Sequence, residues 1–186
     1  MSVSDIPQEW RDILADIQQS APGAVIAGGA LRDLRNDRPV KDLDIFIPKR
    51  EWSTHSLFIH HSLERRGFHL LTNYRIHYGL MEEVQSLEFI SRDKHCVPLN
   101  IIIDPAEKLD TEWIHRFDFG ASMISFDGKV LHVTERFLRD CALKRFTYFR
   151  NKGVEDIERS RHRAHRIGKK YPGWHFIFPA EEEGFY

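Results

Sequence analysis

The 186-residue sequence contains only two cysteines, Cys96 and Cys141. They form neither a closely spaced metal-binding pair nor a disulfide framework. No segment has the roughly 20 consecutive apolar residues that a membrane-spanning helix needs, and the charged N-terminus lacks the apolar stretch of a signal peptide. These absences argue against a membrane protein and predict a cytoplasmic location.

The sequence also has almost no net charge, formally −1 from 27 basic and 28 acidic residues. Overall charge therefore gives no indication of nucleic-acid binding. The charges are unevenly placed, however, because residues 139–170 contain eleven Lys or Arg and four acids. A segment of this kind either faces phosphates or is a solvated helix surface, and the sequence leaves both readings open.

The remaining composition is that of a folded protein, with 41% hydrophobic residues and 13 Phe. Hydrophobic periodicity predicts helices over 7–19, 30–35, 49–66, 134–150 and 154–171, and strands over 24–28, 40–48, 74–79, 86–92 and 96–104. A hairpin with an Asp-Gly turn is expected within 117–133, and the aromatic segment 174–178 is expected to dock back on the chain. The pattern predicts an α+β fold, with a head at residues 1–133 and a helical extension at 134–186.

One stretch carries recognisable chemistry: a short strand, Gly28-Gly29, a helix, and then Asp42 and Asp44 on the next strand. Glycines at a helix N-terminus let a phosphate approach free backbone N–H groups. Residues i and i+2 of a strand point the same way, so Asp42 and Asp44 are expected to present both carboxylates to one point. Two carboxylates beside a phosphate suit Mg²⁺. An Asp-x-Asp motif taken alone more often lies on the solvent-exposed face of a strand.

The order and spacing of these residues resemble a known signature. AGGALRD (27–33) followed by RPVKDLDIFI (38–47) is similar to the signature of class II CCA-adding enzymes and bacterial poly(A) polymerases, within the DNA polymerase beta superfamily of nucleotidyltransferases. RFDFGASMISFDGKVLHV (116–133) is similar to that family's second motif, and EDIER (155–159) has the form of its base-selecting helix. The resemblance implies a polymerase beta-like head, with a short mixed sheet and helices, followed by C-terminal helices.

The resemblance also implies roles for individual residues. Gly28 and Gly29 would bind the triphosphate, and Arg32 and Asp33 would shape and charge that pocket. Asp42 and Asp44 would be the catalytic residues that hold Mg²⁺ or Mn²⁺. Asp118 would lie near the nucleotide sugar, and Asp156 and Arg159 would read the base. Exposed helix residues for the Arg32-Asp33 pair, and an N-cap or turn for Asp118, are the competing structural interpretations.

The sequence departs from the family pattern at several positions. The superfamily normally has a third carboxylate on a neighbouring strand, where this sequence offers Asn100, an amide that cannot act as a base. Glu88 and Asp104 are the alternative third ligands. Phe117 replaces a second Arg, Gly120 replaces Thr, and Asp37 replaces a helix-ending Gly.

The leading functional hypothesis is a Mg²⁺-dependent enzyme that transfers a nucleotidyl group from an NTP to a hydroxyl acceptor and releases pyrophosphate. An RNA 3′ end ranks first as acceptor, followed by a small molecule or a protein. The chain looks like a minimal stand-alone member of the kind found in bacteria and phages. The main alternative is a catalytically weak or inactive nucleotide-sensing module of the same fold, and a plain nucleic-acid-binding domain ranks last. Oligomeric state, base preference and biological role are open.

Overall fold

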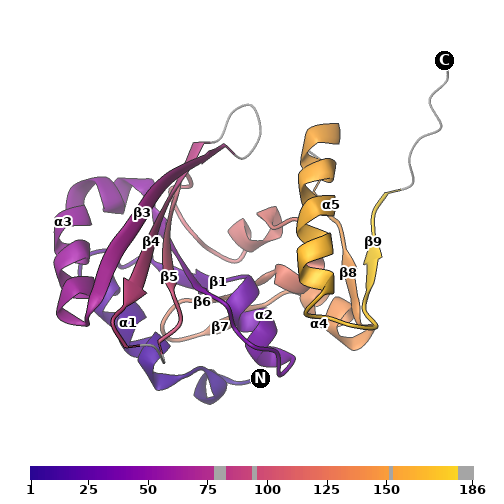
Figure 1. The fold of residues 1–186 in the computed structure, drawn as a ribbon, viewed down its shortest axis with the longest axis horizontal. Coiled ribbons are helices and arrows are strands. Elements are labelled where there is room, and N and C mark those ends of the chain that lie inside the picture. Colours follow the sequence, from indigo (N-terminus) through magenta and orange to yellow (C-terminus); the bar gives the residue numbers. More distant parts are fainter. Residues whose placement is uncertain (78–82, 94–95, 151–152, 180–186) are drawn as a thin grey trace.

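The computed structural model describes residues 1–77, 83–93, 96–150 and 153–179, and it has an α+β architecture (Figure 1). The helices are α1 (Gln8–Gln18), α2 (Gly29–Arg35), α3 (Lys49–Arg65), α4 (Glu135–Ala142) and α5 (Val154–Gly168), with 3-10 turns η1 (Val3–Asp5), η2 (Trp113–Arg116) and η3 (Gly120–Ser122). The strands are β1 (Val25–Ala27), β2 (Leu43–Pro48), β3 (Phe68–His77), β4 (Glu83–Ser91), β5 (Leu99–Asp104), β6 (Ile124–Phe126), β7 (Leu131–Val133), β8 (Arg145–Thr147) and β9 (His175–Ile177).

A seven-stranded mixed sheet forms the centre of the head, in the order β3-β4-β5-β2-β1-β6-β7. Only the β2–β5 pair among these strands is parallel. Because side chains alternate along a strand, β2 places Leu43, Ile45 and Ile47 on one face and Asp44 and Phe46 on the other. The first set is buried in the main core, which the apolar sides of α1 and α3 cover.

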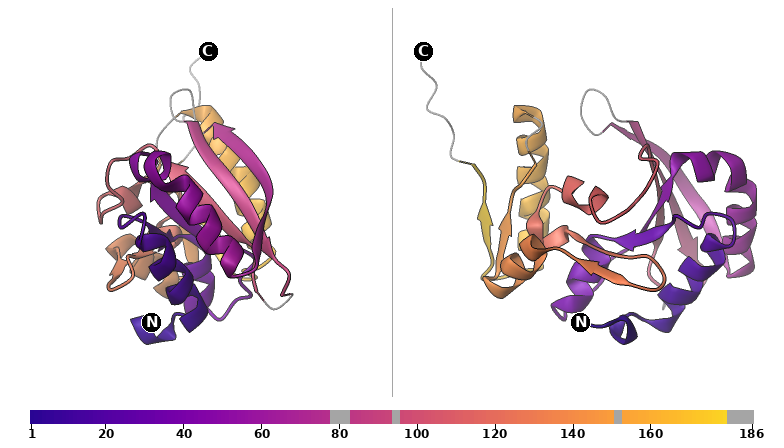
Figure 2. Two further views of the ribbon diagram at one scale, coloured as in Figure 1. Left: turned by 90° about the vertical axis from the view of Figure 1, so that its left-hand side faces the viewer. Right: turned by 180° about the vertical axis from the view of Figure 1, so that it is seen from behind.

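The opposite face of the sheet carries a smaller apolar cluster beside Asp44. Val25 and Ala27 of β1 and Phe46 of β2 pack there against Trp113 and Ile114 of η2. The rings of Phe46 and Trp113 meet edge to face with 4.9 Å between their centroids. Figure 2 shows η2 between the sheet and the C-terminal elements when the molecule is seen from behind.

The C-terminal elements form a third apolar cluster with the segment that follows η2. The cluster contains Phe119 and Ala121 together with Phe146, Ala164 and Tyr171. Strand β9 pairs in parallel with β8, and the rings of Phe146 and Phe176 stack with 4.8 Å between their centroids. The predicted docking of the aromatic segment 174–178 on its own chain is therefore confirmed.

Most predicted elements are present, with shifted ends. The strand predicted at 74–79 begins earlier, at Phe68, and residues 78 and 79 lie outside the described residues. The helix predicted over 134–150 is wrong beyond residue 142. There Lys144 adopts a positive φ of 49° and the chain turns into β8, because buried Asp140 accepts hydrogen bonds from the backbone N–H and hydroxyl of Thr147. These tertiary bonds override a helical pattern.

None of the helices in the described ranges combines the length and the apolar character needed to cross a membrane.

Candidate active site

A row of polar side chains crosses the open face of the sheet on four adjacent strands. Strand register aligns Asp44 of β2 with Asn100 of β5, Asn100 with Glu88 of β4, and Glu88 with Thr72 of β3. The amide nitrogen of Asn100 donates to Oδ1 of Asp44 at 2.9 Å. The hydroxyl of Thr72 lies 3.4 Å from Oε2 of Glu88. Directly opposed residues share a face, so the four side chains form one line.

Asp42 and Asp44 lie beside each other at the start of β2. Asp42 immediately precedes the strand, and Lys41 lies 3.4 Å from its carboxylate on the solvent side. Burial and, to a smaller extent, the negative charge of Asp42 together raise the pKa of Asp44 from 3.8 to about 6. A hydrogen bond from Asn100 and the more distant charges of Arg163 and Arg32 only partly offset this. Two mutually repelling carboxylates with a shortage of positive charge are a suitable donor set for a divalent cation.

The position of the superfamily's third carboxylate is occupied by Asn100, as its pairing with Asp44 shows. Asp104 is aligned with Pro48 at the far end of β2, and its carboxylate accepts from the indole N–H of Trp113 and the backbone N–H of Ala106. It is therefore not brought toward Asp44. Glu88 lies one strand beyond Asn100 in the polar row. Within the described parts of the chain, no three Asp, Glu, His or Cys side chains gather closely enough to hold one metal ion.

Gly28 and Gly29 stand where β1 ends and α2 begins, as the motif predicts. Gly28 adopts φ 78°, a conformation that disfavours any residue with a Cβ. A Cβ built at Gly28 would also come within 3.1 Å of the ring of Phe117. Phe117 belongs to the aromatic group of Phe46 and Trp113, so the residue that replaces the family's second Arg forms an apolar wall beside the glycine turn.

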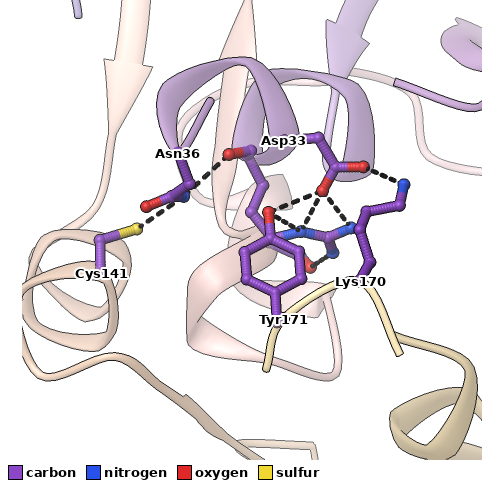
Figure 3. Close-up of polar contacts among 7 residues, drawn as sticks. Asp33, Asn36, Cys141, Lys170 and Tyr171 are labelled. Carbon is purple, nitrogen blue, oxygen red and sulfur yellow. Dashed lines mark hydrogen bonds and ion pairs between the residues drawn. The ribbon is translucent and has the colours of Figure 1, made fainter. Parts of the chain in front are cut away.

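Arg32 and Asp33 are buried, not exposed, and they join α2 to the C-terminal segment (Figure 3). The guanidinium of Arg32 contacts Oδ1 of Asp33 at 2.8 Å and donates to the hydroxyl of Ser122. Asp33 also accepts from the hydroxyl of Tyr171 at 2.7 Å and pairs with Lys170. Burial raises the pKa of Tyr171 above its ordinary range, so this hydroxyl stays a donor. Both charges of the pair thus have partners within the chain.

Asp118 is likewise buried, and it fixes α5 to the segment before η3. Its carboxylate accepts from the backbone N–H of Phe119 at 3.0 Å, from the hydroxyl of Ser160 at 3.2 Å and from Arg163 at 3.0 Å. The charge of Arg163 in turn acts on Asp44. The three contacts place the Arg163 side of α5 toward the head.

Asp156 and Arg159 contact each other on α5, with Nη2 of Arg159 3.4 Å from Oδ1 of Asp156. Asp156 is buried, accepts from the hydroxyl of Tyr148 at 2.8 Å and pairs with Arg150 at 3.1 Å. The side chain of Arg159 is 44% exposed. Of the two residues expected to read a base, only Arg159 therefore has an exposed polar end.

Two further departures from the family pattern have local causes. A Cβ on Gly120 would lie 2.6 Å from Oδ2 of Asp140 and 2.8 Å from the ring of Phe149, so there is no room for the usual Thr. Asp37 adopts φ 52°, the left-handed conformation that a glycine would otherwise supply at the end of α2.

Sequence reasoning missed the partners of these buried charged residues. They are Ser122, Tyr148, Ser160, Arg163, Lys170 and Tyr171. The available signal was the cluster of cations in 139–170, which is equally typical of a solvated helix surface. The partner of each acid is determined by tertiary contacts. Asp33, for example, contacts Lys170 and Tyr171, which are more than a hundred residues away in the sequence.

Comparison with known proteins gives one family and one fold. The family model described as "Gabija anti-defense 2 family protein" matches residues 4–144. Among solved structures, a CCA-adding enzyme of Thermotoga maritima in complex with tRNA is similar at a TM-score of 0.63 and 17% identity, over 97% of this chain and 43% of that one. No curated protein sequence matches the chain.

Two other solved structures agree. A tRNA-processing enzyme in an apo form is similar at a TM-score of 0.61 and 18% identity, over 92% of this chain and 44% of that one. A CCA-adding enzyme in complex with ATP is similar at 0.60 and 15% identity, over 95% and 41%. The chain thus spans less than half the length of these enzymes. At such identities the likeness establishes the fold, and the predicted polymerase beta-like head is confirmed.

Proposed function

Since the chain belongs to the Gabija anti-defense 2 family and has a nucleotidyltransferase fold, we propose that it acts by Mg²⁺-dependent nucleotidyl transfer. A nucleotidyl group would pass from an NTP to a hydroxyl acceptor, with release of pyrophosphate. The single observation that carries this proposal is the pair of carboxylates at the start of β2, Asp42 and Asp44, whose proximity raises the pKa of Asp44.

The donor set fits a divalent cation. Asp42 and Asp44 would hold it, and the side-chain oxygen of Asn100 is available as a neutral ligand because its nitrogen is the atom that donates to Asp44. Mg²⁺ in such a site neutralises phosphate charge and lowers the pKa of a bound hydroxyl. The protein's own contribution is to keep both carboxylates on one side of β2 and to align Asn100 with them.

The nucleotide-binding residues divide into two groups by burial. Gly28 and Gly29, beside the carboxylate pair, are proposed to receive the triphosphate, and exposed Arg159 to contact the base. Arg32, Asp33, Asp118 and Asp156 are buried and saturated with protein partners. We propose that these four act by holding α2 and α5 in place and not by touching the nucleotide.

The acceptor is proposed to be an RNA 3′ end. The similar solved enzymes include one in complex with tRNA and one in complex with ATP, and the segment that forms α5 is basic. A small molecule or a protein side chain ranks next. We further propose that the transfer counters the Gabija defence, a role suggested by the description of the family.

A second candidate function rests on Asn100. Without a third carboxylate the site lacks the usual base for the attacking hydroxyl, and a protein of this kind would bind nucleotide without turning it over. Such a nucleotide-sensing module would sequester an NTP or signal its presence.

One experiment distinguishes the two candidates. The protein is incubated with each labelled NTP, Mg²⁺ and RNA, protein or small-molecule acceptors, and label transfer and pyrophosphate are measured. Transfer that is lost in the Asp42→Asn, Asp44→Asn double variant supports the enzyme. NTP binding without pyrophosphate release for any acceptor would contradict transfer and favour the sensing module.

A further inference from the structure

Helix α5 presents a basic stripe to solvent. Arg159, His162, Arg166 and Lys169 are all exposed, and they follow one another at intervals of three or four residues, which places them on one face of a helix. The opposite face is buried through Asp156, Ser160 and Ala164. Arg159 pairs with Asp156 on the same helix. From residue 159 to residue 170 the sequence contains no acid, so no acid lies within one helical turn of Arg166 or Lys169 along the chain.

The flank of α5 that adjoins the stripe faces the head. Arg163 on this flank pairs with Asp118, and Lys170, just after the end of α5, pairs with Asp33; both acids are buried residues of the head. Arg166 lies between these two residues in the sequence and is exposed. The stripe therefore borders the side of α5 that carries Arg163, whose positive charge lowers the pKa of Asp44.

The basic surface continues past the end of α5 toward the candidate metal site. Lys170 and Tyr171 contact Asp33 of α2. The guanidinium of Arg38 lies over the ring of Tyr171, 5.6 Å from its centroid, and its Nε has no hydrogen-bond partner among the described residues. Arg38 is four residues before Asp42 in the sequence. A chain of cations thus runs from α5 to the loop that leads into the carboxylate pair.

We propose that the part of the basic stripe beyond Arg159, from His162 to Lys169, together with Arg38, binds the phosphate backbone of a single-stranded RNA and directs its 3′ end toward Asp42. The direction of the RNA rests on the proposed function, whereas the binding itself does not. Spaced cations on an open helix face suit a flexible strand of phosphates, because each phosphate needs only a nearby charge and releases counterions on binding.

The test measures binding of a fluorescent single-stranded RNA of about 20 nucleotides by anisotropy between about 50 and 200 mM salt. In the Arg166→Gln, Lys169→Gln double variant we expect a loss of affinity of about tenfold. The slope of log affinity against log salt should fall by about 1.4, since each phosphate contact on a single strand contributes about 0.7. The affinity for Mg²⁺-ATP and the thermal midpoint should not change.

The matched control is Lys49→Gln, Arg50→Gln, which removes two exposed cations from α3 and gives the same net charge. It should bind the RNA as the unmodified protein does. Equal losses in both double variants would show a non-specific effect of net charge and overturn the proposal, as would an unchanged salt slope in the α5 variant. A fall in thermal midpoint without a change in RNA affinity would show that the cations only stabilise the end of α5, and would also overturn it.

The same assay separates this inference from the proposed function. The Asp42→Asn, Asp44→Asn variant should bind RNA at least as tightly as the unmodified protein. RNA binding by the stripe without label transfer would contradict nucleotidyl transfer and leave the inference standing.

Discussion

Asp44 is a carboxyl group whose surroundings disfavour its charge. Its pKa is raised from 3.8 to about 6 by burial and by Asp42, so the folded chain holds the protonated form more readily than the unfolded chain does. Stability therefore falls as the pH rises from about 4 to about 6, and above that range the full cost of the charge is present. A divalent cation bound as proposed would remove this cost.

We predict that Asp44→Asn stabilises the metal-free protein at pH 7.5 by on the order of 1–3 kcal/mol. The amide removes the charge and still offers an oxygen to Asn100. The gain should largely disappear near pH 4, where the aspartate is protonated in the folded state and partly protonated in the unfolded state. Urea unfolding at the two pH values measures this, and an equal gain at both would contradict the electrostatic explanation. In the transfer assay the same variant should be inactive.

Gly120 is a second residue whose identity is determined by its neighbours. We predict that Gly120→Ala destabilises the fold by about 1–3 kcal/mol, because the new Cβ would press on Asp140, a buried acid with several partners. Gly168→Ala is the matched control, since its Cβ would meet only the ring of Phe176 at 3.4 Å. Thermal unfolding of both variants is the measurement. Similar midpoints would show that the space around Gly120 relaxes easily.

At the scale of elements, α2 is held between the sheet and the C-terminal segment by buried ionic contacts. Tyr171 donates to Asp33, and its ring lies against the guanidinium groups of Arg32 and Arg38. A short helix of this kind depends on its tertiary contacts for stability. The position of the Gly28-Gly29 turn at its start consequently depends on residues near the end of the chain.

We predict that Tyr171→Phe costs about 1–3 kcal/mol of unfolding free energy, because it leaves a buried carboxylate short of one donor. It should also raise the KM for NTP more than it lowers kcat, since α2 carries the proposed triphosphate turn. Lys169→Ala, two residues away and exposed, is the control for stability. A stability loss with an unchanged KM would show that the network does not position the turn.

The helices and strands were predicted best where a single local pattern determines their position. The alternation of Leu43, Ile45 and Ile47 fixes the faces of β2, and the glycine pair marks the start of α2. The helix predicted over 134–150 ends before Leu143, because Asp140 accepts hydrogen bonds from Thr147. Hydrophobic periodicity does not reveal such contacts. The burial of Asp33 and Asp118 was also not predictable, since they pair with Lys170 and Arg163, which are distant in the sequence.

At the scale of the whole molecule, the proposed boundary at residue 133 and the family match ending at residue 144 fall before the elements that complete the third apolar cluster. Phe119 and Ala121 belong to the head by sequence and to the C-terminal cluster by packing. The two parts therefore share a core, and they are expected to fold together.

We predict that removing residues 145–186 leaves a protein that aggregates or is rapidly cleaved by protease. The truncation would expose Phe119, deprive Asp33 of Lys170 and Tyr171, and deprive Asp118 of Ser160 and Arg163. The expected cost is several kcal/mol in a fold of ordinary stability. Circular dichroism and limited proteolysis test this, with removal of residues 180–186 as the control. A stable, cooperatively folded 1–144 fragment would show that the head is independent.

The pairing of Asn100 with Asp44 has an evolutionary consequence. An asparagine codon becomes an aspartate codon when its first base changes, so a centre with three carboxylates is a single mutational step from this one. The backbone and the neighbouring strands would stay as they are. Under the proposed function, selection in the laboratory for faster nucleotide turnover should accordingly recover Asn100→Asp early. Recovery of changes elsewhere alone would contradict the assignment of Asn100 to the position of a third metal ligand.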